Sequence, residues 1–289
     1  MKKKITKALF PVAGLGTRFL PVTKASPKEM LPIVDKPLIQ YAVEEAIAAG
    51  ITDLIFITGR NKRAIEDHFD KAYELENELL LGNKIELLNL VKNIIPQGIN
   101  CIFIRQSEAL GLGHAVLCAK SILENDNFAV ILADELIDAK PGALTQLLNV
   151  FNETGSSVIG LQEIDIKNSS LFGMVKLSDK SSEYSRVEFI VEKPNEIDSP
   201  SNIAVIGRYI LTPKIFDELS NLNQGVNGEI QLSDAILKLL HKDKVFGLIV
   251  KGHRFDCGSK LGYLKATVCY GLKHEETGYL FKQYLKEIC

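Results

Sequence analysis

The sequence predicts an α/β protein with a mixed, mostly parallel central sheet and helices on both faces. Apolar strand patterns and amphipathic helix patterns alternate four times between residues 7 and 153, which is typical of units that form parallel sheets. After Gly155 the pattern changes to short strands separated by turns, which indicates a mixed or antiparallel extension. Helical patterns then return, so a helical carboxyl-terminal region is also expected.

The elements follow in order along the chain. Buried strands rich in apolar and β-branched residues are expected at 7–12, 54–58, 100–105 and 128–132. Helices are expected at 38–49, 62 to about 91, 113–123 and 142–153, with a break near Gly82 in the second. Later strands are expected at 156–161, 174–177, 186–191 and 203–211, and later helices at 213–219, 229–240, 260–270 and 275–288.

The bulk properties fit one globular enzyme domain. The chain has 289 residues, of which 46% are hydrophobic, enough for an ample core. We expect a single domain, 1–289, with a core of about 1–225 and a carboxyl-terminal helical region of about 226–289. The loop-like stretch Asn223–Gly228 separates the two parts.

The charge and the cysteines limit location and partners. The net charge is −2, which gives no overall field that favours nucleic acid or an anionic membrane. The five cysteines are scattered without a Cys-x-x-Cys pair, as expected for reduced thiols in the cytoplasm. The lysine-rich start resembles a secretory leader, but Pro11 and the glycine loop that follows interrupt it. We therefore expect an unprocessed cytoplasmic protein.

A glycine loop after the first expected strand predicts a polyphosphate site. Gly14 and Gly16 let the backbone approach a ligand closely. Thr17 and Arg18 follow at once, and Lys28 lies ten positions after Arg18. Exposed amides with fixed positive charge suit phosphate oxygens. The alternative is a tight turn between a strand and a helix, without a ligand.

Two aspartates are candidates for a magnesium site. Asp134 follows the expected strand at 128–132, and Asp256 follows a short apolar stretch and precedes a helix. Because ligands bind beyond the carboxyl ends of strands in such sheets, Asp134 and the glycine loop are expected to share one crevice. Carboxylates there suit Mg²⁺, which matches phosphate substrates. Either aspartate alone has the simpler interpretation of a helix cap or turn residue.

A third candidate group suits a sugar phosphate. Glu192 and Lys193 are adjacent at the end of an expected strand. The carboxylate would accept hydrogen bonds from hydroxyl groups, and the ammonium would pair with phosphate. Gly173 offers backbone against which a flat ring could lie. Surface charge is the alternative for Glu192 and Lys193.

Together these segments closely resemble the sugar-1-phosphate nucleotidyltransferases over nearly the whole chain. The glycine loop marks the superfamily, and the segments that begin at Gly111 and Asp256 point to its uridylyl branch. The segments are Pro11–Arg18, Pro27–Pro32, Asp35–Tyr41, Gly111–Leu117, Val191–Pro194, Gly228–Leu232 and Asp256–Tyr263.

The resemblance implies a Rossmann-like sheet of the nucleotide-diphospho-sugar transferase type, and Mg²⁺-dependent transfer of UMP from UTP to glucose 1-phosphate. The sugar phosphate would attack the α-phosphorus in line, and pyrophosphate would leave. Catalytic cations would be Arg18, Lys28 and Lys193. Nucleotide-binding residues would be Ala13, Gly14, Gly16, Thr17, Glu29, Gln106 and Gly111. Sugar-binding residues would be Gly173, Glu192 and Val205, and metal ligands Asp134 and Asp256. The family commonly forms homodimers or homotetramers, and no nucleic acid or membrane partner is expected.

The sequence departs from the family at one position. The family usually has proline before the metal aspartate, where this chain has Ala133, and Glu135 follows. Alanine loosens the approach to Asp134, and Glu135 could compete for the ion. The apolar positions of the last helices, Leu261, Leu264, Val268 and Leu272, form either core or interface, and core is expected.

Three other functions remain open. A thymidylyltransferase of the same superfamily differs only in accepting one extra methyl group, which a pocket excludes weakly, by about 1–3 kcal/mol. A non-catalytic relative would bind a nucleotide sugar and modulate a partner, but the retained charged residues argue against it. A hydride-transfer enzyme is disfavoured because Phe19 replaces the third glycine of the dinucleotide fingerprint.

Overall fold

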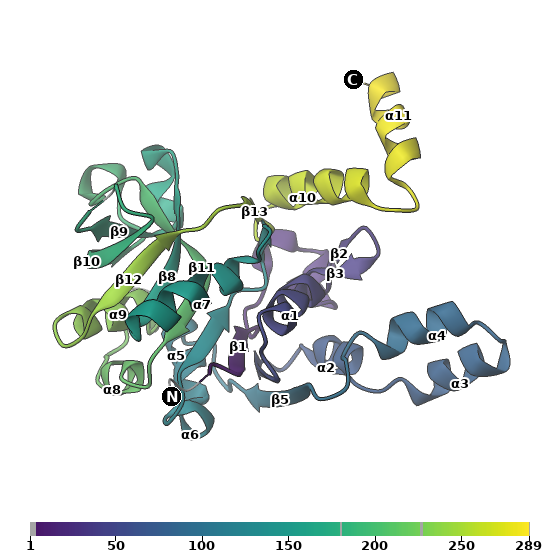
Figure 1. Cartoon of the computed structure of the whole chain (residues 1–289), viewed down its shortest axis with the longest axis horizontal. Coiled ribbons are helices and arrows are strands. Elements are labelled where there is room, and N and C mark those ends of the chain that lie inside the picture. Colours follow the sequence, from purple (N-terminus) through teal and green to yellow (C-terminus); the bar gives the residue numbers. More distant parts are fainter. Residues whose placement is uncertain (1–3, 180, 226–227, 289) are drawn as a thin grey trace.

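The computed structural model describes residues 4–179, 181–225 and 228–288. The first three residues, Cys289, residue 180, and residues 226–227 at the predicted internal boundary lie outside this description. The main strands of the described chain are β1 (Lys7–Pro11), β4 (Asp53–Thr58), β5 (Asn100–Arg105), β6 (Phe128–Ile131), β8 (Ser157–Glu163), β9 (Gly173–Leu177), β10 (Tyr184–Glu192), β11 (Ile203–Leu211) and β12 (Val245–Ile249). They form one sheet in the order β5-β4-β1-β6-β11-β8-β12-β10-β9 (Figure 1).

The amino-terminal half of the sheet is parallel, as predicted. Strands β5, β4, β1 and β6 are parallel neighbours. The chain adds β4 and β5 on one side of β1 and then returns to place β6 on the other side. The strand order therefore reverses between β1 and β6, and in such sheets ligands bind beyond the carboxyl ends of the strands at this switch point.

The other half of the sheet is mixed and mainly antiparallel, as predicted for the strands after Gly155, so the expectation that the sheet as a whole is mostly parallel is wrong. β11 is antiparallel to both β6 and β8, and β10 is antiparallel to both β12 and β9. Only β8 and β12 pair in parallel there. The later strands lie close together in sequence, so turns and short connections replace the helical crossovers that parallel pairing requires.

Helices cover both faces of the sheet, as predicted. Alternate residues of β1 point to opposite faces: Ala8 and Phe10 belong to one buried cluster and Leu9 to the other. The first cluster includes residues of α1 (Leu38–Ala48), α2 (Arg63–Phe69) and α7 (Ala143–Thr154). The second includes residues of α5 (Leu112–Cys118), α6 (Lys120–Leu123), α8 (Ile215–Ser220) and α9 (Leu232–Leu240).

Short elements that the sequence pattern did not predict shape the edge of the crevice. β7 (Glu135–Asp138) and β13 (His253–Asp256) form an antiparallel ribbon. β2 (Pro32–Ile33) pairs with β3 (Lys36–Pro37). A small third cluster joins both ribbons to α10 (Lys260–Lys273) through buried side chains such as Ile33, Phe255 and Ala266. Strands of two to four residues are too short to give a periodic signal.

The long helix predicted from residue 62 to about 91 is three helices. α2 ends at Phe69, and α3 (Tyr73–Leu81) and α4 (Ile85–Lys92) form a hairpin that projects from the body (Figure 1). The break near Gly82 is confirmed. Short 3₁₀-helices lie at Thr17–Phe19, Val22–Lys24, Lys28–Met30, Ile166–Leu171 and Glu196–Asp198.

The carboxyl-terminal helices are present, but their apolar face is not core. α10 and α11 (Gly278–Ile288) extend away from the sheet (Figure 1). Leu261 and Leu264 are 63% and 59% exposed, and Val268 and Leu272 are each 39% exposed. The core interpretation of these residues is therefore wrong, because α10 turns Ala266 rather than its leucines toward the ribbon. No helix in the described parts of the chain has the length and apolar character to cross a bilayer.

Candidate active site

The glycine loop after β1 is fixed against the turn that carries Lys28. Gly16 has φ +67°, and a Cβ there would lie 3.2 Å from Lys28 Cβ. The Thr23 hydroxyl donates a hydrogen bond to the Gly16 carbonyl (2.8 Å). A Cβ at Gly14 would meet nothing within 4 Å. The loop is thus anchored at Gly16 and open at Gly14, as expected of a backbone that receives a ligand.

Lys28 joins the glycine loop to the loop after β6. Its ammonium donates a hydrogen bond to Asp134 Oδ2 over 2.6 Å, and both side chains are largely buried. Burial by itself would lower the pKa of Lys28, but the carboxylates of Asp134 and Glu29 raise it above its ordinary value. Burial would raise the pKa of Asp134, but Lys28 and Arg18 lower it. Each group therefore holds the other in its charged form.

Asp256 and Asp134 converge on one small space above Gly258. The ribbon pairs Asp256 with Glu135, and the Cys257 amide donates to the Asp134 carbonyl (2.8 Å). A Cβ at Gly258 would lie 3.0 Å from Asp134 Oδ2, 3.0 Å from Asp256 Oδ1 and 3.4 Å from Arg18 Nη2. Two carboxylates and a guanidinium thus border a space that exists because residue 258 has no side chain.

The groups around this space suit a hard divalent ion whose coordination shell is completed by water and substrate phosphates. Mg²⁺ is usually held by one or two carboxylates together with waters and substrate phosphates. No cluster of three or more His, Cys, Asp or Glu side chains suited to a metal occurs among the described residues. Asp134 and Asp256 would therefore supply part of the coordination shell, and the phosphates and water the rest.

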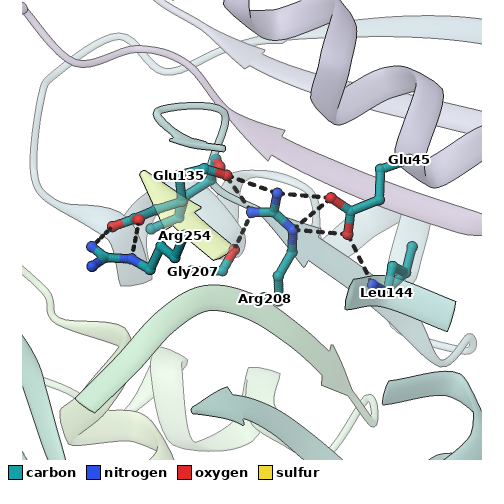
Figure 2. A network of polar contacts seen from close by, with 7 residues as sticks. Glu45, Glu135, Leu144, Gly207, Arg208 and Arg254 are labelled. Atoms are coloured by element: carbon teal, nitrogen blue, oxygen red, sulfur yellow. Dashed lines mark hydrogen bonds and ion pairs between the residues drawn. The ribbon is translucent and has the colours of Figure 1, made fainter. Parts of the chain in front are cut away.

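Glu135 does not face this space as a free carboxylate. Its two oxygens accept hydrogen bonds from Nε and Nη2 of Arg254 (2.5 and 2.7 Å), and Figure 2 shows the two side chains meeting end to end. The Arg254 guanidinium also lies over the Phe172 ring, 4.7 Å from its centroid. The concern that Glu135 competes for the ion therefore loses its structural basis.

The residues expected to bind the uracil base lie on the glycine loop and at the start of α5. The Gln106 side-chain amide donates to the Gly111 carbonyl (3.3 Å) and contacts His114 Nδ1 (2.9 Å). Gly111 has φ +93°, and a Cβ there would lie 2.9 Å from the Ile230 carbonyl oxygen, so only glycine fits. Ala13 lies on the glycine loop, where its carbonyl packs against Gly59.

Glu29 lies beneath the loop rather than on its open surface. It is 1% exposed, and its carboxylate accepts a hydrogen bond from the Lys62 ammonium over 2.7 Å. Burial raises the pKa of Glu29, while Lys62 and Lys28 act in the opposite direction. The pair ties the turn before β2 to the start of α2. The expected contact of Glu29 with a nucleoside stays a prediction.

The residues expected at the sugar end meet where β9, β10 and β11 run side by side. A Cβ at Gly173 would lie 3.3 Å from Glu192 Oε2 and 3.6 Å from Val205 Cγ2. Glu192 also accepts a hydrogen bond from the Ser233 hydroxyl (2.9 Å). Gly173, Glu192 and Val205 therefore lie together, and their expected role in holding the sugar stays a prediction.

Lys193 lies at the exposed end of this group in an unusual backbone conformation. Its φ is +45°, and its amide donates to the Phe172 carbonyl (2.9 Å). The side chain is 56% exposed, and its ammonium lies 3.5 Å from Glu192 Oε1. A left-handed conformation costs a residue with a Cβ roughly 1 kcal/mol or more and is common where a side chain must point at a ligand.

Sequence reasoning missed four residues that support the site. Three of them, Lys62, His114 and Ser233, contact predicted site residues directly, and Arg254 holds Glu135. Lys62 and Ser233 sit at or near helix starts and carry no motif. No role was expected for His114, because the five histidines of the chain are spread without ligand spacing.

The chain is similar to nucleotidyltransferases of known sequence and structure. The family model described as nucleotidyl transferase matches residues 7–271. A UTP–glucose-1-phosphate uridylyltransferase of Staphylococcus epidermidis is 48% identical over 286 residues, which cover 99% of each chain. The structure of a UTP-bound UGPase from Acinetobacter baumannii is 42% identical with a TM-score of 0.92, over 99% of this chain and all of that one. A UDP-glucose pyrophosphorylase complexed with UDP-glucose is 44% identical with a TM-score of 0.86, over 94% of this chain and all of that one.

The buried Glu29–Lys62 pair predicts a pH-dependent loss of stability. Lys62→Met should lower the free energy of unfolding by about 3 kcal/mol at pH 8, because Glu29 stays buried without its partner. The loss should shrink toward pH 5. Without Lys62, burial raises the pKa of Glu29 in the folded variant, so at pH 5 the buried carboxyl is protonated and neutral, whereas in the unfolded chain it ionises above its ordinary pKa. Urea unfolding at both pH values measures this, and an equal loss at both would contradict it. The double variant Glu29→Gln/Lys62→Met should lose the pH dependence.

Proposed function

The chain belongs to the nucleotidyl transferase family, and we propose that it is the enzyme that transfers UMP from UTP to glucose 1-phosphate, giving UDP-glucose and pyrophosphate. One observation carries the proposal. Arg18, Lys28, Asp134 and Asp256 converge at the switch point of the sheet, beside an open glycine loop. Relatives more than 40% identical were solved with UTP and with UDP-glucose.

The glycine loop and its cations would hold the triphosphate. Backbone amides of Gly16 and Thr17 and the Arg18 guanidinium would surround the phosphates. Ala13 and Gly14 would meet the uracil, and Gln106 and Gly111 would read its polar edge. Lys28 already lies on Asp134, so it is held within the same site. Two polyanions must approach each other, and this positive charge reduces their repulsion.

The sugar phosphate would bind at the other end of the crevice. Glu192, Gly173 and the backbone of Val205 would hold the sugar, and Lys193 would pair with its phosphate. An oxygen of that phosphate attacks the α-phosphorus of UTP in line, a new P–O bond forms, and the bond to the β-phosphate breaks to release pyrophosphate. The protein's part is alignment and charge neutralisation, without a covalent intermediate on the enzyme.

Asp134 and Asp256 would hold Mg²⁺. When bound, the ion would supply positive charge that reduces the repulsion between the phosphates of the two substrates. We propose a cytoplasmic location, where thiols stay reduced, because the four cysteines of the described chain are free.

A pyrophosphate-release assay tests the proposal. Release should require UTP, glucose 1-phosphate and Mg²⁺ together, and should stop when any of the three is omitted. dTTP in place of UTP measures cross-use, and absence of NAD(P)H binding would exclude a hydride-transfer enzyme. A protein that binds UDP-glucose but releases no pyrophosphate would be a non-catalytic relative, and the proposal would fail.

Lys193 should matter for the sugar phosphate specifically. Lys193→Ala should raise KM for glucose 1-phosphate and lower kcat, with a combined loss of roughly a hundredfold in kcat/KM, because one charge-assisted contact to a reacting phosphate is removed. Steady-state kinetics with each substrate varied in turn measure this. Lys167→Ala, which removes an exposed lysine outside the site, is the control. Unchanged kinetics in Lys193→Ala would remove Lys193 from the site.

Asp134 should govern the dependence on metal. Asp134→Asn keeps the size of the side chain and removes its charge, so the Mg²⁺ concentration for half-maximal rate should rise roughly tenfold or more. Asp243→Asn removes a carboxylate from a surface ion pair with Lys214 and is the control. If Mg²⁺ titrations of both variants overlay that of the parent, Asp134 holds no metal.

We also propose that a second copy of the chain covers the apolar face of α10. Leu261, Leu264, Val268 and Leu272 form an exposed stripe beside a hollow of about 480 Å³ that Phe255 and Cys269 help to line. α11 adds the exposed side chains of Tyr279, Leu280, Tyr284 and Ile288. Apolar surface of this extent is rarely left open in a monomer. A homodimer, or a homotetramer of such dimers, would bury it.

The assembly has a direct test. Leu264→Glu places a charge in the middle of the stripe and should shift the protein toward monomer by at least tenfold in dissociation constant. Ile197 is 93% exposed and lies outside the stripe, so Ile197→Glu should have no effect. Light scattering across a dilution series measures both. A parent protein that is monomeric at high concentration would contradict the proposal.

A further inference from the structure

We propose that Arg208 is a positioning residue that fixes the loop after β6 and so sets the direction of the Asp134 carboxylate. The role deepens the proposed function, on which its catalytic consequence rests. Arg208 lies on β11 and does not belong to any motif that the sequence singled out. It touches neither of the sites expected for substrate.

The Arg208 guanidinium clamps the loop from both sides of Asp134. Nη1 donates to the Leu132 carbonyl (3.1 Å), and Nη2 donates to the Glu135 carbonyl (2.8 Å). Asp134 lies between these two anchored peptides. Figure 2 shows the guanidinium between the loop and Glu45, with hydrogen bonds on each side. Arg208 uses its planar fork here to bind backbone oxygens rather than a ligand.

Two helices hold the guanidinium in place. Glu45 of α1 accepts hydrogen bonds from Nε (3.1 Å) and Nη2 (2.9 Å) of Arg208. The same carboxylate accepts a hydrogen bond from the Leu144 amide at the start of α7 (2.8 Å). The Arg208 and Glu45 side chains are 1% and 10% exposed. The clamp is therefore attached to α1 and α7 and not to a flexible surface.

A bulge in β11 aims Arg208 at the loop. The register between β11 and β8 shifts between Val205 and Tyr209, and Gly207 has φ +66°. The Leu132 amide donates to the Gly207 carbonyl (2.9 Å), and a Cβ at Gly207 would lie 2.9 Å from Leu132 Cβ. The loop packs directly on this glycine. Bulges often redirect a side chain next to a functional site.

Stability alone is a weak reason for this arrangement. The attraction between the charges of a buried ion pair usually offsets little more than the cost of removing both charges from water. The loop that the pair holds carries Ala133, which lacks the fixed φ that a proline would supply. The clamp supplies that restriction by binding the carbonyl oxygens on both sides of Asp134. We infer that the pair serves geometry rather than stability.

Arg208→Lys tests the role because lysine keeps the charge but cannot span both carbonyls. The control is Glu218→Gln. It breaks the ion pair of Glu218 with Lys242, which also contains a buried carboxylate but lies away from the site. The first readout is amide hydrogen exchange of peptides that cover residues 128–138, in the protein without substrate. The second is the thermal midpoint, and the third is kcat, KM for UTP and the Mg²⁺ concentration for half-maximal rate.

The expected result is specific to the loop. In Arg208→Lys, exchange at the Leu132 and Glu135 amides should rise about tenfold or more, while Glu218→Gln leaves it unchanged at a similar thermal midpoint. The rate constant kcat should fall roughly tenfold to a hundredfold and the Mg²⁺ requirement should rise, with KM for UTP little changed. If Arg208→Lys does not fold, Glu45→Gln should give a smaller change in the same direction.

Two outcomes would overturn the role. In one, exchange in the loop equals that of the control although stability falls. In the other, exchange rises but the Mg²⁺ dependence and kcat stay at parent values. The exchange measurement does not depend on activity. A parent protein that releases no pyrophosphate would therefore contradict the proposed function, and the exchange data would still decide whether Arg208 holds the loop.

Discussion

The contact between the Lys28 ammonium and the Asp134 carboxylate is the interaction on which the candidate site depends. It joins two loops that are 106 residues apart in sequence and that leave the sheet on either side of its switch point. Each charge is buried and would be costly alone, so each keeps the other ionised. The glycine loop, the ribbon that carries Asp256 and the turn at Glu29 are all arranged around this pair.

A second layer of charge lies behind the first and faces the protein rather than the crevice. Glu29 with Lys62, Glu135 with Arg254 and Glu45 with Arg208 each anchor a segment that carries a site residue. The groups that face the crevice differ in kind: Lys193 is largely exposed, and Gly14 and Gly258 offer space. Alignment of two phosphates requires an open, charged surface where the substrates bind. It also requires that surface to be held in place, and the ion pairs on its protein side do this.

The sequence predicted the parallel half of the sheet and the residues that meet at its carboxyl edge, because both leave local signals. The apolar runs of β1 and β6 are long enough to be recognised, and Gly14, Gly16 and Arg18 form a continuous motif. The mixed or antiparallel character of the other half was predicted from the strands after Gly155, but its strand order, the short ribbon of β7 and β13, and the support from Arg208 and Lys62 were not. Those features depend on pairings between residues such as Glu135 and Asp256 that are far apart in the chain. The leucines of α10 illustrate the same limit, since their pattern fits burial within a chain and burial between chains equally well.

The central claim is that one crevice brings two phosphates together at the switch point of the sheet. The most direct measurement is an electron-density map of crystals soaked with UDP-glucose and Mg²⁺. The account predicts the diphosphate beside Arg18 and the space above Gly258, with the uracil near Gly14 and the glucose against Gly173 and Glu192. Density for the nucleotide sugar elsewhere on the molecule, with the space above Gly258 filled by solvent alone, would contradict it.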